Sequence, residues 1–545
     1  MRVHPIDRAI AAVAPAWAVK RVQARMHLAA VSALPDTTVV QASDDSTGGN
    51  APGFMRRFWN AVARDARSDT LRKLPTQRAQ SRELARTSPI AVGAINTNID
   101  RVVGTGLALS MQPALKVLGW TPEQAIEWKA LVQREFSLWA DSTDCDIEQQ
   151  LNFYQLQALV LRATLESGDC FTLLPDGDRT ATQPYALRLQ VLEADRVGNP
   201  LGQMDTATIA GGVKLTPSGA PLAYHLYDQH PGSYLPAAGS SIFAGQWVDR
   251  LGRSGRRRML HHFRKLRPGM PRGVPYLAPI IDCVKQISRY TEAEIMAAVI
   301  TAYLTVFIES PTGNAAPVFD GQAAVAQQQD VGLGMGSVVG LAPGEKANVV
   351  NPGRPNPNFG PFIDAVVKQM GIALGLPYEL LVKQFNASYS ASKAALLDAW
   401  VYFRSVRYWL SQSFCQPVFE TWMAEAVAIG RVPALGFFND PILRWAYTRA
   451  AWPGDSMGSI NPKDEVAAYV AAIEARLLTR ERAEWELFGS DWNDTYAQKL
   501  MEHERLNKDG MAPTPKAGAA APQPAPKPEG KPAPDAPPTN EEDAQ

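Results

Sequence analysis

The longest regular run of apolar positions lies in the last third of the chain and predicts one long helix over residues 392–430. Ser390 or Ser392 can cap its start, and Gly430 suits its end. Pro417 should kink it, because a proline ring clashes with the preceding helical turn. Its apolar residues recur every three or four positions, the spacing of one buried face; they are Leu396, Trp400, Phe403, Val406, Leu410, Phe414, Val418 and Trp422.

A polar loop over residues 379–391 connects this helix to an earlier helical pattern over 358–378. One cation and several neutral polar groups contact a phosphate backbone weakly and without reading base sequence, which suits DNA that slides past. An ordinary connection between two helices remains a competing interpretation. The candidate contact residues are Lys383, Gln384, Asn386, Ser388, Tyr389 and Ser390.

The first half of the chain changes from helical to β patterning. Thr121 and Gln124 form a capping box that starts a helix, and a second helix is expected over residues 153–166. Alternating apolar residues then predict strands at 168–174, 185–192, 213–215 and 224–227, separated by Gly/Pro turns. The sequence therefore predicts an α+β protein. The buried stripe expected on the first of these helices consists of Trp128, Val132, Phe136 and Trp139.

A further helix is expected over residues 276–305, followed by an insert over 306–357. Segments 305–308, 337–341 and 347–350 of the insert suggest a strand pair, so the insert should form a small α/β lobe on two helical legs. The side of the helix that is available for packing carries Ile280, Val284, Ile287, Ile295 and Val299.

Both ends of the chain differ from its body. Residues 1–60 are expected to form an arm, flexible in part, and residues 511–545 are rich in Pro and Ala and too polar to order themselves. Before that tail, Pro462 and Thr479 each mark a helix start. The most apolar window has about fourteen residues, fewer than the roughly 20 that span a bilayer, so no membrane segment is expected.

Composition and charge narrow the class of protein. The 545 residues include 54 Lys+Arg and 54 Asp+Glu, so the neutral total excludes a polybasic nucleic-acid coat but allows local patches. The basic segment 60–88 spreads its arginines around a helix and is interpreted as a solvated face before a nucleic-acid patch. The denser run from Arg250 to Arg258, which continues to Arg272, could contact phosphates or an acidic surface of a neighbouring subunit. The four cysteines are far apart and are expected to be free thiols of a reducing compartment.

Motifs for common enzymes are missing from the sequence. It contains no Walker A motif, no G-x-S-x-G and no H-E-x-x-H, and the glycines at 332–340 do not complete G-x-G-x-x-G. His261 and His262 are adjacent and should point apart. Asp141, Asp144 and Asp146 could bind a divalent ion for a metal-dependent nuclease, which is kept as an alternative function. No cofactor is predicted.

Short motifs in a fixed order resemble the lambda-type family of portal proteins of tailed bacteriophages, over about residues 60–510. Asn461 stands where the family more often has Asp, and Lys393 where Arg is usual. The motifs are QSRELAR at 80–86, RVVGTGL at 101–107, SGDCF at 167–171, VLEADR at 191–196, AYH at 223–225, HPG at 230–232, RPGMPRGV at 267–274, LGLPYE at 374–379, YSASKAAL at 389–396, NPK at 461–463 and TR at 479–480.

This resemblance implies a portal-protein fold with a helical and β wing, a two-helix stem, a small α/β clip, a long wing helix and a helical crown. The implied boundaries are 61–275 for the wing, 276–305 and 358–378 for the stem helices, 306–357 for the clip, 379–391 for the tunnel loop, 392–430 for the long wing helix, 431–461 for the connection to the crown and 462–510 for the crown.

The resemblance also implies a function without catalysis. Copies of the chain, usually twelve, form a ring at one capsid vertex, through which double-stranded DNA is packaged and ejected. The implied partners are the terminase large subunit, which carries the ATPase, the head–tail connector, and the major capsid and scaffold proteins, with assembly in the host cytoplasm. On the stem, Lys285, Arg289 and Lys368 are candidates to line the channel. A scaffold or adaptor without a channel is a second alternative.

Overall fold

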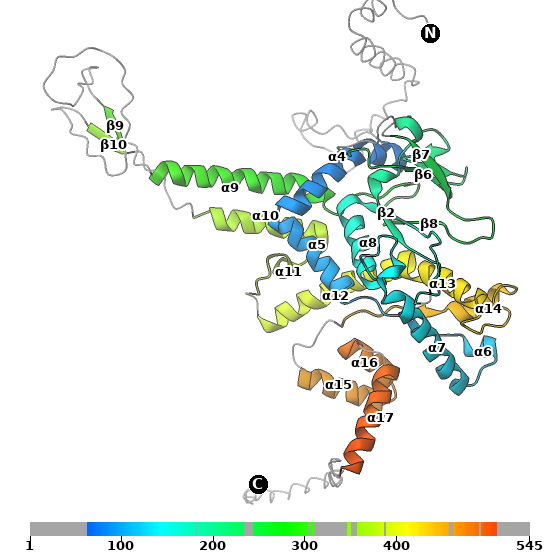
Figure 1. Cartoon of the computed structure of the whole chain (residues 1–545). Coiled ribbons are helices and arrows are strands. Elements are labelled where there is room, and N and C mark those ends of the chain that lie inside the picture. The colour runs from blue at the N-terminus through cyan, green and yellow to red at the C-terminus, as the bar shows by residue number, and fades with distance from the viewer. Residues whose placement is uncertain are drawn as a thin grey trace, which may run out of the picture. The chain divides into compact units, whose positions relative to one another are not determined.

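The computed structural model describes residues 63–180, 182–233, 243–302, 306–309, 346–349, 357–385, 388–456, 462–489 and 492–509. The chain divides into two compact units, residues 1–64 and 65–545, and the elements below belong to the second. The expected arm at 1–60 and tail at 511–545 lie outside the described residues. Helices and antiparallel sheets both occur in the larger unit, in agreement with the predicted mixture of α and β structure (Figure 1).

Two helices, α4 (Ala66–Thr87) and α5 (Pro89–Val102), meet at Ser88. The backbone N–H of Ser88 donates to the carbonyl of Leu84 at 2.9 Å and closes α4. Its Oγ accepts from the N–H of Ala91 at 3.4 Å and opens α5. One serine therefore both ends a helix and caps the next.

The helix α7 (Pro122–Ala140) begins at the predicted capping box. The N–H of Gln124 donates to Thr121 Oγ1 at 3.4 Å, and the N–H of Thr121 donates to Gln124 Oε1 at 3.0 Å. The predicted stripe from Trp128 to Trp139 is buried. Neighbouring elements are α6 (Leu115–Leu118), η1 (Thr143–Cys145) and α8 (Phe153–Ser167).

Two antiparallel sheets follow, with strand orders β3–β2–β8 and β4–β5–β6–β7. Short 3₁₀ turns, η2 (Ala194–Arg196) and η3 (Pro200–Gly202), connect β3 to β4. The strands are β2 (Asp169–Leu173), β3 (Gln190–Glu193), β4 (Ile209–Ala210), β5 (Val213–Leu215), β6 (Pro221–Tyr227), β7 (Gly245–Asp249) and β8 (Met259–Phe263).

The strand predicted over 185–192 was too long, since β3 spans only Gln190–Glu193. The backbone N–H groups of Ala186 and Leu187 donate instead to the carboxylate of Glu425, at 2.6 and 2.9 Å. Because a side chain satisfies these donors, the alternating apolar residues remain buried without belonging to a regular strand.

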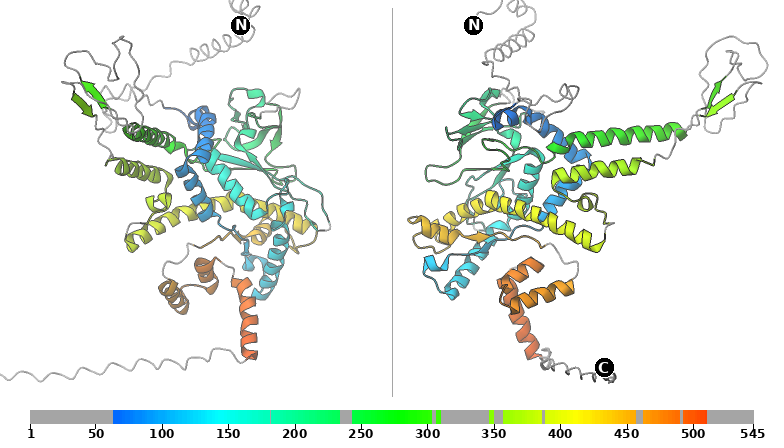
Figure 2. Two further views of the ribbon diagram at one scale, coloured as in Figure 1. Left: turned by 60° about the vertical axis from the view of Figure 1, so that its left-hand side comes forward. Right: turned by 180° about the vertical axis from the view of Figure 1, so that it is seen from behind.

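Two long helices, α9 (Ile281–Ala302) and α10 (Phe359–Leu374), lie side by side in every view (Figures 1 and 2). The helix predicted from residue 276 starts later, because a 3₁₀ turn, η4 (Ala278–Ile280), precedes it. Val284 is buried as expected, but Ile295 and Val299 are 58% and 46% exposed. The expected packing side therefore holds only for the first turns of α9.

A strand pair connects to these helices. Strand β9 (Val306–Glu309) pairs antiparallel with β10 (Lys346–Val349). This pairing matches the prediction for segments 305–308 and 347–350, while the predicted segment 337–341 lies outside the described residues.

The long helix predicted after the polar loop has three consecutive parts: α12 (Tyr389–Leu410), a π-helical turn η5 (Ser411–Cys415) and α13 (Gln416–Ala428). It starts after Ser388, so Ser390 and Ser392 are not its cap. The irregularity expected at Pro417 takes the form of the π turn directly before it, where wider helical bonding accommodates a residue without an N–H. Gly430 follows the helix with φ +77°, as predicted.

The apolar core joins α5, α7, α8 and the long helix. Phe136 makes edge-to-face contacts with Phe153, Phe419 and Trp422, at ring-centroid distances of 5.5, 5.7 and 5.1 Å. Burial of each aromatic side chain contributes about 1.5–3 kcal/mol. From Phe403 to Trp422 the predicted face of the long helix is buried, and only Leu396 and Trp400 at its start are partly exposed.

The chain then forms α14 (Pro441–Thr448) and the short strand β11 (Ala450–Ala451), which pairs with β1 (Ser110–Met111). Three helices complete the described part of the chain: α15 (Pro462–Glu474), α16 (Arg480–Phe488) and α17 (Trp492–Lys508). Thr479 caps α16 as predicted, accepting from the N–H of Arg482 at 3.2 Å. None of the described helices is long and apolar enough to cross a membrane.

Candidate functional site

The predicted polar loop is partly helical. Helix α10 ends at Gly375, whose φ of +68° suits a residue without a Cβ. After Pro377 a short helix, α11 (Tyr378–Val382), packs on α5, α10 and α12. Of the range 379–391, only residues 383–388 therefore lie between helices. We call residues 383–388 the polar segment.

Lys383 begins the polar segment with φ +56°, a left-handed conformation that is uncommon for a residue with a side chain. Lys383 and Gln384 are exposed. Ser388 and Ser390 are also exposed, and their hydroxyl groups lie 3.3 Å apart. Tyr389 is the first residue of α12, and Asn386 lies outside the described residues. The structure thus places the described candidates in a short exposed connection.

The three stem candidates are also exposed. Lys285 and Arg289 are one turn apart on α9 and share a helix face. The Lys368 ammonium lies 5.3 Å from the centre of the Tyr378 ring, and the Tyr378 hydroxyl donates to Asp364 at 2.9 Å. Lys368 therefore contacts the start of α11, which leads into the polar segment.

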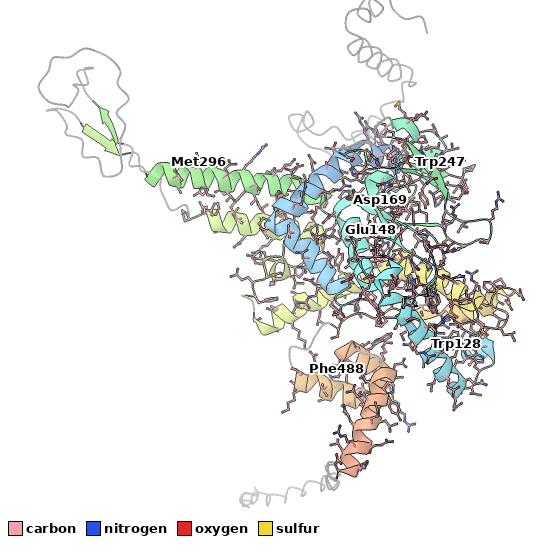
Figure 3. All side chains as sticks on the ribbon, in the orientation of Figure 1. Trp128, Glu148, Asp169, Trp247, Met296 and Phe488 are labelled. Atoms are coloured by element: carbon pink, nitrogen blue, oxygen red, sulfur yellow. The ribbon has the colours of Figure 1, made fainter. Side chains whose placement is uncertain are left out.

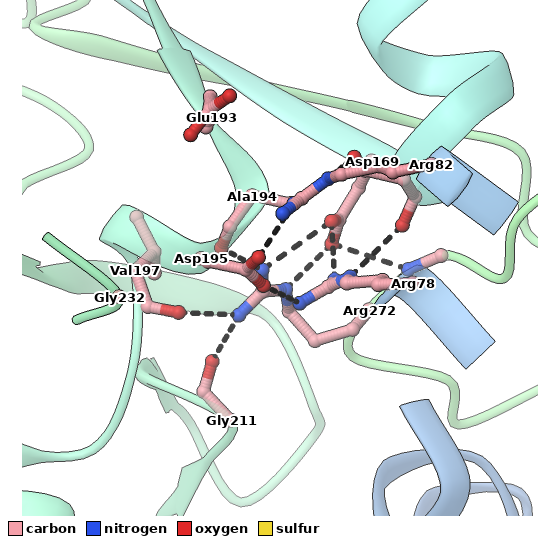
Figure 4. A network of polar contacts seen from close by, with 12 residues as sticks. Arg78, Arg82, Asp169, Glu193, Ala194, Asp195, Val197, Gly211, Gly232 and Arg272 are labelled. Atoms are coloured by element: carbon pink, nitrogen blue, oxygen red, sulfur yellow. Dashed lines mark hydrogen bonds and ion pairs between the residues drawn. The ribbon is translucent and has the colours of Figure 1, made fainter. Parts of the chain in front are cut away.

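The basic segment 60–88 is not uniformly solvated, which corrects the sequence interpretation. Arg78, on α4, is 4% exposed and donates to Asp169 at 2.5 Å. Arg82, one turn later, pairs with Asp195 at 2.5 Å. Both arginines form part of a polar network between α4, β2 and η2 (Figure 4).

Asp169 lies at the centre of this network and is fully buried. Its carboxylate accepts from Arg78, from Arg272 Nε at 2.5 Å and from the N–H of Gly273 at 3.3 Å, while His261 Nε2 lies 3.1 Å away. With this many partners the buried carboxylate is fully hydrogen-bonded, as a charge inside a protein must be. We call Arg78, Arg82, Asp169, Asp195, His261 and Arg272 the ion network.

Arg272 joins distant parts of the chain. Besides Asp169, its guanidinium donates to the carbonyls of Ala194 at 2.6 Å, Val197 at 2.8 Å and Gly211 at 2.5 Å (Figure 4). It also lies 5.1 Å from the centre of the Phe171 ring. One side chain thus connects β2, η2 and the β4–β5 turn, so Arg272 has a structural role and is not a surface cation.

The ionisation of the network follows from its geometry. Burial raises the pKa of Asp169, but the guanidinium groups of Arg272 and Arg78 outweigh burial and hold that pKa well below its ordinary value. Burial lowers the pKa of Arg78 to about 10, which leaves it charged at neutral pH. Burial likewise lowers the pKa of His261, although Asp169 opposes this effect. The network is therefore a set of charged groups held by one carboxylate.

A close backbone crossing accompanies the network. Gly168 has φ +89°, and a Cβ on Gly273 would lie 1.9 Å from the carbonyl oxygen of Gly168. Only glycine fits where two backbones approach this closely. The crossing sets Asp169 and Arg272, each next to one of these glycines, in register with each other.

Four of the motifs behind the family resemblance meet at this network: those at 80–86, 167–171, 191–196 and 267–274 supply Arg82, Asp169, Asp195 and Arg272. His230 of a fifth motif lies 3.3 Å from Glu193. Sequence reasoning identified the motifs but not their common location. The one signal was the pairing of invariant-looking glycines with charged neighbours inside short motifs.

The basic loop from Arg250 to Arg258 is partly neutralised within its own chain. Arg256 pairs with Asp176 at 2.5 Å, and Arg257 pairs with Glu420 at 2.5 Å. These intrachain pairs use two of the arginines that were considered for phosphates or for a neighbouring subunit. Similarly, Lys393 pairs with Glu465 at 3.2 Å.

The carboxylates proposed for a nuclease do not form a metal site. Asp146 is 4% exposed and accepts from the backbone N–H groups of Glu148, Gln150 and Leu151 at 3.2–3.3 Å. Over the residues that the structure describes, no group of three or more His, Cys, Asp or Glu side chains could hold a metal ion. Asp146 therefore shapes the turn before α8.

The adjacent histidines point apart, as predicted. His261 faces Asp169, while His262 Nε2 lies 2.9 Å from Thr172 Oγ1, and its ring is edge-on to Phe414 at 5.5 Å. Burial lowers the pKa of His262 to about 3, so its ring is neutral at physiological pH. Both rings have structural positions within the sheet.

Comparison with known proteins gives a consistent family. The chain is 24% identical to Portal protein B of Escherichia phage lambda, over 87% of this chain and 92% of that protein. It is 26% identical to the portal protein of Escherichia phage N15, with the same coverage. A solved structure described as the neck of a native GTA particle, computed with C12 symmetry, matches 74% of this chain and 92% of that chain, with 13% identity and a TM-score of 0.38. The model of the phage portal proteins of the lambda family matches residues 53–407, and the chain belongs to that family.

Proposed function

We propose that this protein assembles into a ring at one vertex of a phage capsid and forms the channel through which double-stranded DNA is packaged and ejected. The observation that carries the proposal is the family match over residues 53–407. The ring has twelve subunits, as the resemblance implies, and its role is structural, without catalysis. In this role it belongs to the virion.

In this proposal the domains follow the family plan. Residues 61–275 form the wing, whose charged interior is the ion network. Helices α9 and α10 are the stem, and β9 with β10 belongs to the clip over 306–357. Residues 392–430 are the long wing helix, and residues 462–510 are the crown. The side-by-side packing of α9 and α10 supports the two-helix stem.

The polar segment acts as the tunnel loop that contacts moving DNA. Support comes from the exposure of Lys383, Gln384, Ser388 and Ser390 between two helices that hold their ends. One lysine and neutral polar groups per subunit contact phosphates weakly and without sequence preference. Weak contacts let DNA move, whereas a dense cationic surface would retain it. Lys285, Arg289 and Lys368 add positive charge along the stem.

The partners of the ring supply what this sequence lacks. The terminase large subunit provides the ATPase, since the sequence has no Walker A motif. The head–tail connector attaches after packaging, and major capsid and scaffold proteins surround the ring during assembly in the host cytoplasm.

Electron microscopy of the purified full-length protein tests this function. The expected image is a ring with a central hole wide enough for duplex DNA. A protein that stays monomeric under assembly conditions would contradict the proposal. Removal of residues 511–545 should leave the rings unchanged, because that segment has too few apolar residues to form part of a core.

A further inference from the structure

The last three helices, α15, α16 and α17, have almost no interior of their own. Among those of their residues whose burial is described, Ala483 and Glu484 are the buried ones, and none belongs to the main apolar core. Glu484 is charged and is held by Lys499 Nζ at 2.7 Å. Three short helices with this little buried apolar surface do not offset the entropy lost on ordering them.

Their apolar side chains lie at the surface instead. Leu477, Phe488 and Met501 are 83%, 69% and 63% exposed, and Figure 3 shows Phe488 in this group of helices. Two rows are one helical turn long, and all four members are at least 40% exposed: Val466 with Val470 on α15, and Tyr496 with Leu500 on α17. Apolar rows at this density mark a surface that another protein covers.

The two rows lie on different helices of the group. The middle helix, α16, contacts both α15 and α17. Its contacts include polar ones, since the Tyr469 hydroxyl on α15 donates to Glu486 at 3.0 Å and Lys499 on α17 pairs with Glu484. The group therefore offers two apolar rows, one on each of the helices that α16 separates in sequence and holds by polar contacts.

We propose that the row Tyr496/Leu500 of one copy packs against the row Val466/Val470 of the next copy around the ring. This inference rests on the proposed function, and it names the surface by which neighbouring subunits join. A closed ring larger than a dimer needs two different, complementary surfaces on each subunit, whereas a symmetric dimer uses one surface twice. Two separate apolar rows meet the first requirement.

The alternative occupants fit less well. Residues 462–509 contain more acidic than basic side chains, so DNA is not the partner that this surface attracts. The contacts from these helices to the preceding chain include the Lys393–Glu465 ion pair and the hydrogen bond from Ser456 Oγ to the Leu487 carbonyl at 3.0 Å, which are polar and leave the rows exposed. A second copy supplies the apolar surface that both rows lack.

Disulfide trapping tests the pairing directly in the full-length protein. Val470→Cys combined with Leu500→Cys should give, after mild oxidation, a ladder of covalently joined subunits on a non-reducing gel. Each single variant, and the unmodified chain with its four native cysteines, should run as a monomer. Dimers from one single variant would overturn the proposal in favour of a symmetric contact, and rings that show no ladder from the double variant would overturn it as well.

Substitution provides a second measurement. Val470→Asp should raise the subunit concentration needed for half-assembly by about tenfold, the effect of about 1.4 kcal/mol per interface. Ala467→Asp, exposed on the same helix outside the row, is the matched control and should leave assembly unchanged. Hydrogen exchange in residues 462–509 should be slow in rings and fast in dissociated subunits. Equal exchange in both, with rings present, contradicts this pairing alone; absence of rings from the unmodified chain contradicts the proposed function itself.

Discussion

The ion network and the polar segment both carry positive charge, but they use it in opposite ways. Arg272 in the network is 2% exposed and has every printed hydrogen bond within its own chain, whereas Lys383 in the polar segment is exposed. A buried guanidinium must be fully bonded to be tolerated, and it then fixes the elements around it. An exposed ammonium on a short connection contributes little to folding and stays accessible to a ligand.

The comparison teaches that density of charge along a sequence does not identify the surface that meets DNA. The arginine-rich stretches at 60–88 and 250–272 contribute Arg78, Arg257 and Arg272 to contacts inside the chain. The segment proposed to contact DNA has a single lysine. Structure and function are thus divided between the two regions, and each prediction below tests that division.

Asp169→Asn should have the largest effect. It leaves Arg78 and Arg272 buried without their common counter-charge, a change that costs about 3–5 kcal/mol of unfolding free energy. Chemical denaturation of the full-length variant measures this loss, and a low soluble yield is the accompanying sign.

Asp176→Asn is the matched control, because Asp176 also pairs with an arginine but has a side chain that is 57% exposed. Its loss should stay under about 1 kcal/mol. Equal losses for the two variants would mean that burial does not distinguish the ion network from a surface pair.

Gly273→Ala should be the next most damaging change. Its Cβ would meet the backbone of Gly168, and backbone atoms cannot move aside as a flexible side chain can. We expect a loss of about 1–3 kcal/mol in unfolding free energy, as for overpacked cores. Gly93→Ala, with no atom within 4 Å of the added Cβ, should not destabilise the protein. A tolerant Gly273 would show that the crossing does not set the network.

Local features of the fold could be predicted from the sequence, because the residues that determine them are neighbours. The capping box at Thr121 and the buried face of the long helix depend on spacings of three and four residues. The exposed ends of α9 could not be predicted, since Ile295 and Val299 follow the same spacing as Val284 while other elements cover only the first turns.

The ion network shows where sequence reasoning stops. Arg78 and Asp169 are 91 residues apart, and Arg272 is a further 103 residues along the chain. Side-chain type alone gives no sign that these residues meet, so Arg78 was assigned to a solvated face. The motifs carried the information, but their shared purpose depended on the path of the chain. For the polar segment the sequence predicted composition and location, and the structure adds exposure.

The pH dependence of stability separates the two regions on a smaller scale. The folded-state pKa of His262 is about 3, below the ordinary value of 6.5, so the unfolded chain takes up a proton that the folded sheet excludes. Stability should therefore fall as pH drops below about 6.5, by up to about 1.4 kcal/mol per pH unit. Denaturation midpoints between pH 7 and 4 measure the slope. His262→Gln should reduce the slope, and His503→Gln, exposed on α17, should not; identical slopes would remove His262 as the cause.

Lys383→Ala should have the smallest effect on the fold. Because its side chain is exposed, the unfolding free energy should change by less than about 0.5 kcal/mol. Its loss should weaken the salt dependence of DNA binding, with a change of about 0.9 in the logarithmic slope for each phosphate contact removed. Lys116→Ala, an exposed lysine on α6, is the control. An unchanged slope for Lys383→Ala would remove this residue from the DNA contact.

Shortening the polar segment within residues 385–389 tests the division between fold and function most directly. Rings counted by electron microscopy and DNA packaged per particle are measured on the same preparation. The account predicts an unchanged yield of rings and a reduced amount of packaged DNA. Normal packaging through rings with a shortened segment would contradict it.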